Sequence, residues 1–289
     1  MRDYVITTDN NSDLPEEYYK EHGVGCTYLS YSMDGKNYTH ENFLPVQEFY
    51  DAMRKGSLPT TAQVNPDDVR QLIEPYLKEG KDVLHIAFSS GLSGTYNSAR
   101  IAVEELKEEY PERSVIVMDS RAASLGQGLL VYLAQQHKEA GEDMETVAKW
   151  VEENRNHIVH LFTVDDLFHL HRGGRVSKTT AIVGSMLNIK PVLHVDNEGK
   201  LVNIGKSRGR KKALQELVSL MEQKIGSYKN SCHTIFISHG DCEEDAQYVE
   251  KKVKEKYDID TVMINYVGSV IGAHSGPGTL ALFFVGEEK

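Results

Sequence analysis

The stretch Asp82-Val-Leu-His-Ile-Ala-Phe-Ser-Ser-Gly-Leu-Ser-Gly-Thr95 decides the fold class of this 289-residue chain. It starts with an apolar run typical of a buried strand. Its end, rich in serine and glycine, leads into a helical pattern over Thr95–Tyr110. A strand followed directly by a helix is the repeating unit of a parallel sheet covered by helices. We therefore expect an α/β fold, with the loop Ser89–Gly94 at the carboxyl end of a strand.

The same alternation extends to both sides of this stretch. Buried-strand patterns cover Tyr4–Thr8 and Ser114–Met118. Helical patterns lie over Val46–Lys55, Asp67–Lys78 and Leu125–Ala140. In such sheets, ligands bind beyond the carboxyl ends of the strands. The polar loop Asp9–Asp13 and the pair Asp119-Ser120 also follow strands directly, so we expect them near a site.

The pattern changes after a helical segment at Met144–His157. A β-hairpin is indicated by Pro191–Val195, the turn Asp196–Gly199 and Lys200–Lys206. The other expected elements are strands at His160–Asp165, Thr234–Ser238 and Thr261–Val267, a short helix at Lys178–Leu187, and longer helices at Arg210–Ile225 and Glu243–Tyr257. We predict two domains: residues 1–160 as a Rossmann-like α/β domain with a parallel sheet, and residues 161–289 as an α+β domain.

The overall composition is that of an ordinary globular protein, with 40% hydrophobic and 26% charged residues. A net charge of −11 argues against a nucleic-acid partner, because such a surface is strongly basic. Three widely spaced cysteines suggest reduced thiols, as expected in the cytoplasm. The sequence enters a strand pattern at once, which predicts no signal peptide, and no apolar run reaches the roughly 20 residues of a membrane span.

Three segments carry candidate site residues. Pro59–Pro66 and Phe88–Ser98 are rich in hydroxyl groups and poor in charge, a composition that suits binding of a carboxylate or phosphate. In Gly268–Gly278, His274 stands among glycines and a proline, between strand patterns at Thr261–Val267 and Leu280–Val285. We expect a glycine-rich turn there, with His274 at a backbone-lined site.

The loop around Ser93 allows three interpretations. It can bind an anion at the start of the following helix, or Ser93 can merely cap that helix. Alternatively, Ser93 is the nucleophile of a hydrolase, with His274 as base and Asp119 to orient it. The segment lacks the lysine of a phosphate-binding P-loop, and Gly91-Leu-Ser-Gly-Thr95 departs from the Gly-x-Ser-x-Gly nucleophile elbow.

Four further motifs carry polar or charged side chains that could do chemistry. Asp9–Asp13 resembles the start of a calcium loop but lacks its glycine and its closing acid, so a turn with Asp9 fixing the loop is favoured. The histidines at 157, 160, 169 and 171 lack a metal-binding spacing, and we expect no metal. Arg172-Gly-Gly-Arg175 is either an anion clamp or a glycine turn with solvated arginines. Lys206–Lys212, at the start of a helix, is the densest basic run of an acidic chain, and it suggests binding of phosphate or an acidic partner.

Taken together, these segments resemble the DegV family of bacterial fatty-acid-binding proteins, in order and over nearly the whole chain. Two departures are visible: Asn10-Asn11 where the family usually has Ser-Thr or Ser-Ser, and Ser275 where threonine is common. The matching segments are Thr7–Pro15, Thr60–Pro66, Ser89–Tyr96, Met118–Ser120, Arg172–Ser177, Leu187–Val192 and Ile271–Gly278.

The resemblance implies that one long-chain fatty acid lies buried between two domains. It implies a lipid-carrying subunit of a two-component fatty acid kinase, whose separate ATP-dependent subunit phosphorylates the carboxylate to an acyl-phosphate for phospholipid synthesis. On this basis the carrier is not an enzyme by itself. It has no cofactor and no nucleotide site, and its contact with an acyltransferase or a membrane surface is transient. A small-molecule sensor without chemistry is a further alternative.

The resemblance also assigns residues to these roles. Thr61, Ser93 and His274 are expected to bind the carboxylate, with Asp9, Gly94 and Ser120 as supporting loop residues. Arg208 is expected to dock the kinase subunit, and Arg172 and Arg175 are weaker candidates for the same contact. From their position near the motifs, we expect apolar residues such as Ile182, Met186 and Leu187 to line the tunnel.

Overall fold

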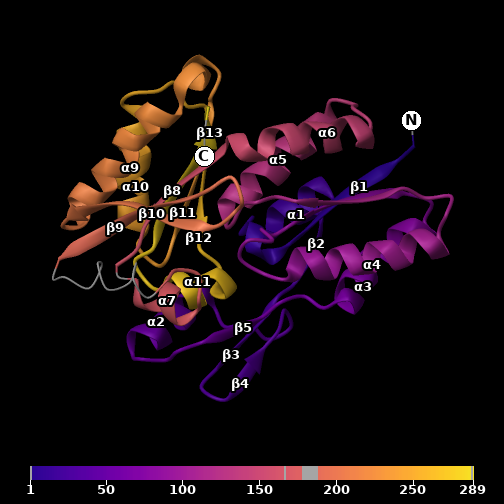
Figure 1. Cartoon of the computed structure of the whole chain (residues 1–289), viewed down its shortest axis with the longest axis horizontal. Coiled ribbons are helices and arrows are strands. Elements are labelled where there is room, and N and C mark those ends of the chain that lie inside the picture. Colours follow the sequence, from indigo (N-terminus) through magenta and orange to yellow (C-terminus); the bar gives the residue numbers. More distant parts are fainter. Residues whose placement is uncertain (1, 166, 178–187, 288) are drawn as a thin grey trace.

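A four-stranded parallel sheet forms the first half of the protein (Figure 1). The computed structural model describes residues 2–165, 167–177, 188–287 and 289. The strand order is β2-β1-β6-β7, from β2 (Gly25–Thr27), β1 (Tyr4–Asp9), β6 (Asp82–Ala87) and β7 (Val115–Asp119). β1 and β6 are buried along their whole length, which explains why their sequences lack the alternation of apolar and polar residues seen in strands with one exposed face.

Helices cover both faces of this sheet. α3 (Pro66–Lys78) and α4 (Thr95–Glu109) pack on one face. The other face is covered by α1 (Glu16–His22), α5 (Leu125–Glu139) and α6 (Met144–Asn154). The start of α3 is fixed by a capping box in which Asn65 and Asp68 exchange side chain to backbone hydrogen bonds, followed by proline at the first helical position.

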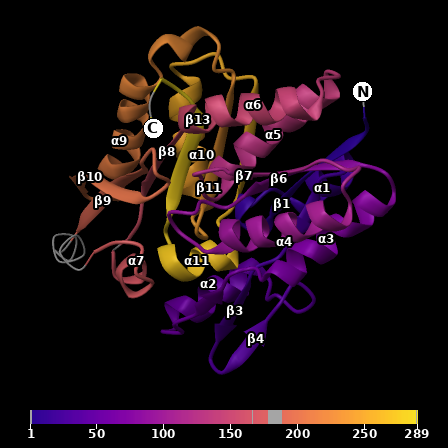
Figure 2. The same ribbon diagram turned by 45° about the vertical axis from the view of Figure 1, so that its right-hand side comes forward.

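A six-stranded mixed sheet forms the second half. Its order is β10-β9-β8-β13-β11-β12, and only β11 and β12 run parallel. The strands are β8 (Ile158–Thr163), β9 (Ile189–Val195), β10 (Leu201–Arg208), β11 (Thr234–His239), β12 (Thr261–Tyr266) and β13 (Leu280–Val285). α9 (Arg210–Lys224) and α10 (Glu243–Lys254) cover one face. The other face packs against α5, so one helix contributes to the cores of both sheets (Figure 2).

The expected α/β fold is thus confirmed: a parallel sheet in the first half, and a mixed sheet with helices in the second. The domain boundary at residue 160 stays a prediction. β8 starts at Ile158 and already belongs to the six-stranded sheet. The predicted helix Lys178–Leu187 lies outside the described residues.

A third, three-stranded antiparallel sheet was not predicted. β3 (Ser30–Met33) is its central strand, between β4 (Lys36–Tyr38) and β5 (Thr60–Ala62). It packs with α2 (Val46–Arg54) around a core of Tyr31, Phe49 and Tyr50. This small unit lies beneath the two larger sheets in Figure 1.

Two local predictions were wrong. The segment around His274 is a short helix, α11 (Ser269–Ser275), instead of a glycine turn. Its backbone N–H groups at Gly272 and Gly276 bond to carbonyls four residues earlier, so glycine does not prevent a helix at this buried position. The prediction that the basic run begins a helix was wrong for its first half: Lys206–Arg208 end β10, and α9 begins at Arg210. α7 (Phe168–Arg172) and three short 3₁₀ turns (Asn10–Ser12, Arg155–His157 and Gly226–Asn230) complete the described elements.

Candidate functional site

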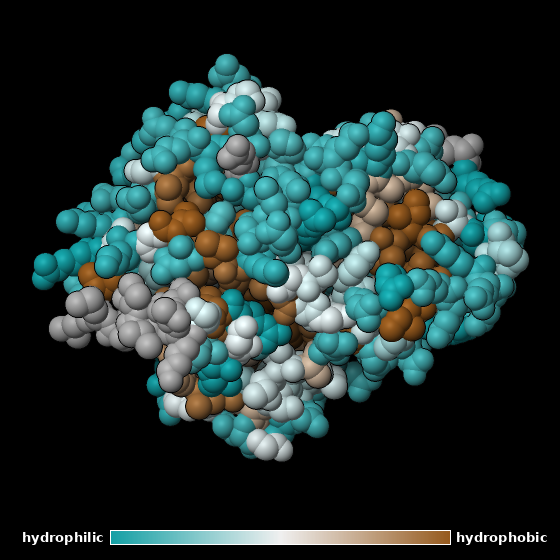
Figure 3. Space-filling view, in the orientation of Figure 1, coloured by the Kyte–Doolittle hydropathy of each residue, from teal (hydrophilic) through white to brown (hydrophobic). Residues whose placement is uncertain are grey.

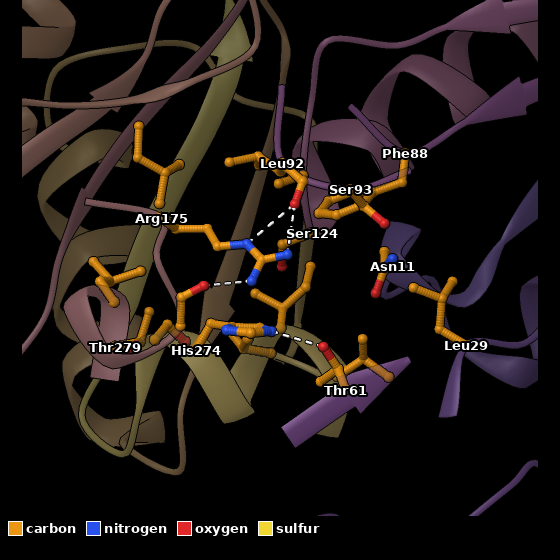
Figure 4. A pocket seen from close by; sticks show the side chains of 18 of the residues that line it. Asn11, Leu29, Thr61, Phe88, Leu92, Ser93, Ser124, Arg175, His274 and Thr279 are labelled. Carbon is orange, nitrogen blue, oxygen red and sulfur yellow. Dashed lines mark hydrogen bonds between the residues drawn. The ribbon is translucent and has the colours of Figure 1, made fainter. Parts of the chain in front are cut away.

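A cavity of about 400 Å³ lies between the sheets (Figure 4). Its volume is in the range of roughly 300–1,000 Å³ that is usual for small-molecule sites. Both halves of the chain supply its walls, and most of the side chains are apolar. The apolar lining comes from Leu29, Phe88, Leu92, Phe162, Leu170, Val195, Leu201, Val267, Val270, Ile271, Ala281 and Phe283. In Figure 3, hydrophobic side chains are visible in the hollow between the hydrophilic outer surfaces.

Thr61 and His274 meet at one wall of this cavity. Thr61 stands on β5, and His274 lies in the last turn of α11. The Thr61 Oγ1 and His274 Nε2 atoms are 2.8 Å apart, which makes a hydrogen bond between residues distant in sequence (Figure 4). The structure therefore brings together two residues that the sequence analysis assigned to one site.

The small third sheet holds both partners in place. Thr61 is paired with Tyr31 in β3, and α11 packs on the same core through Ala273. The Tyr50 hydroxyl donates a hydrogen bond of 2.7 Å to the Val267 carbonyl just before α11. Gly272 permits the close approach of α11, because a Cβ there would lie 2.6 Å from the Tyr50 hydroxyl oxygen.

The imidazole of His274 is neutral at physiological pH. Burial, together with the positive charges of Arg175 and Arg172, lowers its pKa to about 4. Its Nδ1 atom forms no hydrogen bond with any described residue. A neutral ring has one donor and one acceptor nitrogen. When Nε2 accepts from the Thr61 hydroxyl, Nδ1 carries the proton; when Nε2 donates to that hydroxyl, Nδ1 is the acceptor.

Ser93 lines the same cavity from the loop before α4. Its Oγ lies 2.9 Å from Thr95 Oγ1 and accepts the Thr95 backbone N–H at 3.2 Å. Ser93 thus satisfies one N–H of the first helical turn and also faces the cavity. Gly94, at the helix cap, lies against Gln63, which is another lining residue.

The hydrolase arrangement is not formed. No hydrogen bond joins Ser93 to His274 or His274 to Asp119 in the described part of the chain. His274 bonds instead to Thr61, and Asp119 accepts from the Ser90 hydroxyl and from backbone N–H groups. The geometry gives this alternative no support.

Arg172 and Arg175 lie in the cavity wall. Arg172 donates to the carbonyls of Pro59 (2.7 Å) and Ala273 (2.9 Å), and Arg175 donates to that of Leu92 (2.8 and 3.1 Å). Among the residues that the structure describes, neither guanidinium has a carboxylate partner within 4 Å. Burial lowers the pKa of both groups. A docking role for these two arginines stays a prediction.

Of the predicted supporting residues, Gly94 lines the cavity, whereas Asp9 and Ser120 lie behind its wall. Asp9 is fully buried, and its carboxylate accepts the backbone N–H groups of Asn11 (3.1 Å) and Phe88 (2.7 Å). Burial raises the pKa of Asp9 to about 6. Ser120 is also fully buried and accepts the Ala122 N–H at 3.1 Å. Both residues fix the loops that end β1, β6 and β7.

Other predicted residues lie elsewhere. Arg208 is exposed at the end of β10 and does not line the cavity. Ile182, Met186 and Leu187 are outside the described residues. Within the described part of the chain no group of His, Cys, Asp or Glu could hold a metal. His160 lines the cavity, but its ring lies within hydrogen-bond distance of Ala123 N (3.2 Å) and Ile158 O (2.8 Å).

Among the polar lining residues that sequence reasoning missed are Asn11 and Ser275. Asn11 is fully buried and Ser275 is 5% exposed, and their side-chain polar atoms have no partner in the described structure. In the sequence, both residues stand out only because they depart from the family pattern. That departure was the available signal, because each stands inside a segment that otherwise matches.

Comparison with known proteins extends over the whole chain. A family model described as "Uncharacterised protein, DegV family" matches residues 3–287. The chain belongs to the DegV family. A DegV domain-containing protein of Clostridium perfringens is 45% identical over 100% of this chain and 99% of its own length.

Solved structures of the family agree with this fold. A DegV family protein from Thermus thermophilus, described by its fatty acid binding, has a TM-score of 0.88 and 31% identity, covering 99% of this chain and 100% of its own. DegV of Bacillus subtilis, described as a fatty acid binding protein, has a TM-score of 0.85 and 30% identity with the same coverage. No helix in the described parts of this DegV protein is long and apolar enough to cross a membrane.

Proposed function

We propose that this DegV protein binds one long-chain fatty acid in the cavity between its sheets. Thr61, Ser93 and His274 would bind the carboxylate, and the apolar walls would enclose the acyl chain. Fatty acid binding by the relatives from Thermus thermophilus and Bacillus subtilis supports this assignment.

The observation that carries the proposal is a set of unpartnered polar atoms at one wall of a cavity that also has many apolar lining side chains. His274 Nδ1, Arg172 Nε and Ser275 Oγ are buried and form no hydrogen bond with described residues. Buried polar groups without partners are costly. A ligand with a polar head and an apolar body would satisfy these atoms and cover the walls.

Electrostatics favours a negatively charged head. The guanidinium groups of Arg172 and Arg175 have no carboxylate partner among the described residues, and their charges depress the pKa of His274. A carboxylate would offset both positive charges and accept from the hydroxyl groups. The acyl chain would add about 0.8 kcal/mol per buried CH₂, so a long chain would be retained firmly.

Mass spectrometry tests this proposal directly. We expect the protein purified under native conditions to carry about one fatty acid, which is released only after denaturing extraction. A protein that is isolated empty and takes up no added palmitic or oleic acid would contradict it.

We further propose that the bound carboxylate is phosphorylated by a separate ATP-dependent kinase subunit. In that reaction a carboxylate oxygen attacks the γ-phosphorus of ATP, an O–P bond forms, and the bond to ADP breaks. The chain supplies no P-loop lysine in Ser89–Thr95, which is consistent with a nucleotide held by a partner. Arg208 is exposed and basic, and it is the proposed docking contact.

Charge reversal at Arg208 separates docking from lipid binding. We expect Arg208→Glu to lower the rate of acyl-phosphate formation by about tenfold or more, because reversing a charge at the contact weakens association with the kinase subunit. Fatty acid content should stay unchanged. The product is trapped with hydroxylamine in the presence of the kinase subunit and ATP. Lys149→Glu, at an exposed position on α6, is the matched control and should retain the rate.

A further inference from the structure

Asn11 is an unusual residue in the cavity wall. It follows β1 in a short 3₁₀ turn, is 0% exposed, and lines the cavity. Neither its Nδ2 nor its Oδ1 atom forms a hydrogen bond with a described residue. A buried amide has two donors and one acceptor to satisfy, so leaving both ends unpartnered costs stability.

Its backbone, by contrast, is firmly held. The Asn11 N–H donates to Asp9 Oδ1, and the other oxygen of that carboxylate accepts the Phe88 N–H at the start of the Ser93 loop. The Asn11 amide lies close enough to Asp9 to lower the pKa of that carboxyl, opposing the larger effect of burial. Asp9 thus joins the Asn11 turn to the loop that carries Ser93, and Figure 4 shows the polar atoms of Asn11 and Ser93 facing the same part of the cavity.

The neighbouring residue shows what a structural asparagine does in this loop. The Oδ1 atom of Asn10 accepts the Leu29 N–H at 2.8 Å and so ties the turn to the start of β3. Asn11 makes no such tie. Its amide faces the cavity, and apart from the contact that lowers the pKa of Asp9, removing it deletes no side-chain interaction with the described residues.

We infer that the Asn11 amide is a further contact to the ligand, donating Nδ2–H to the carboxyl group from the side of the cavity where Ser93 lies. The inference rests on the proposed fatty acid function and names a residue that sets head-group affinity in this chain. The amide provides a second donor beside the hydroxyl groups and keeps an oxygen acceptor in the same place. Serine or threonine at this position would offer only one donor.

Stability and affinity should respond in opposite directions to Asn11→Ala. We expect the ligand-free protein to melt at the same temperature or higher, because an unsatisfied buried amide is lost. We expect the dissociation constant for palmitic acid to rise about 10- to 100-fold, the range for one hydrogen bond to a charged group. Asn10→Ala is the matched control. It should lower the melting temperature and leave the dissociation constant nearly unchanged.

A spectroscopic measurement locates the contact. With palmitic acid labelled with ¹³C at the carboxyl carbon, the bound resonance should shift in Asn11→Ala and stay in place in Asn10→Ala. Wild-type protein that binds palmitic acid, together with an unchanged resonance and affinity in Asn11→Ala, would overturn this inference and leave the proposed function intact. Wild-type protein that binds no fatty acid would overturn both.

Discussion

At the scale of single residues, the candidate site combines neutral acceptors and donors with positive charge in the wall. His274 is kept neutral by burial and by two guanidinium groups. A neutral imidazole bonded to a threonine hydroxyl can hold an anion in place through a hydrogen bond. That chemistry suits the carboxylate binding proposed above.

Removing the Thr61 hydroxyl tests this arrangement. Thr61→Val keeps the shape of the side chain but leaves His274 Nε2 without its partner at 2.8 Å. We expect about tenfold weaker fatty acid binding, corresponding to one lost hydrogen bond of roughly 1–1.5 kcal/mol. Thr61→Ser retains the hydroxyl and should bind nearly as well as wild type. Equal affinities for the two variants, measured by isothermal titration calorimetry, would show that the hydroxyl makes no contribution.

At the scale of elements, α11 decides where His274 lies. Within this helix, Gly272 and Ala273 are small and buried, which lets α11 pack closely on α2 and the third sheet. The helix therefore has little freedom to move without disturbing Tyr50.

Gly272→Ala is expected to break this packing. The added Cβ would lie 2.6 Å from the Tyr50 hydroxyl oxygen and 3.1 Å from a Phe49 ring carbon. We expect a loss of about 1–3 kcal/mol in the free energy of unfolding, with weaker fatty acid binding because His274 moves. Chemical denaturation measures the first effect. If the clash with the hydroxyl is the cause, Gly272→Ala combined with Tyr50→Phe should lose less than the sum of the single variants.

The sequence predicted some elements better than others, for physical reasons. β1 and β6 are buried on both faces, so their apolar runs were unmistakable. β4 and β5 have three residues each, too few for a periodic pattern. α11 was missed because its glycines suggest a turn, whereas tertiary packing stabilises the helix. The resemblance placed Thr61 and His274 together, but the orientation of Asn11 depends on a hydrogen bond to Asp9 that no local pattern reveals.

At the scale of the whole molecule, Asp13 links the two halves. Its carboxylate accepts from the Ser124 hydroxyl at the start of α5 and from the Gly268 N–H before α11, and Asn265 donates to its carbonyl. Burial raises the pKa of Asp13 to about 8, although the two hydrogen bonds oppose this effect. The joint between the halves is therefore built around an acid whose pKa lies above neutrality.

Asp13 makes a predictable contribution to the pH dependence of stability. Its pKa is about 8 when folded and 3.8 as the reference value, so between these values the folded state keeps a proton that the unfolded state releases. Stability from this group therefore falls as pH rises from about 4 to 8. Asp13→Asn should flatten the decline, most clearly between pH 6 and 8, where Asp9 contributes less. Denaturation curves across this range provide the measurement, and the exposed Asp258→Asn should leave the slope unchanged.

The place of β13 in the six-stranded sheet has a consequence for synthesis on the ribosome. β13 lies between β8 and β11, both of which precede it in the chain, and Ala281 and Phe283 from this strand line the cavity. Until it emerges, β8 and β11 each present an unpaired edge, and such edges promote association between nascent chains. The cavity is therefore completed only after β13 has been synthesised, later than the other strands of this sheet. Until then, a growing polypeptide would depend on chaperones to cover those edges.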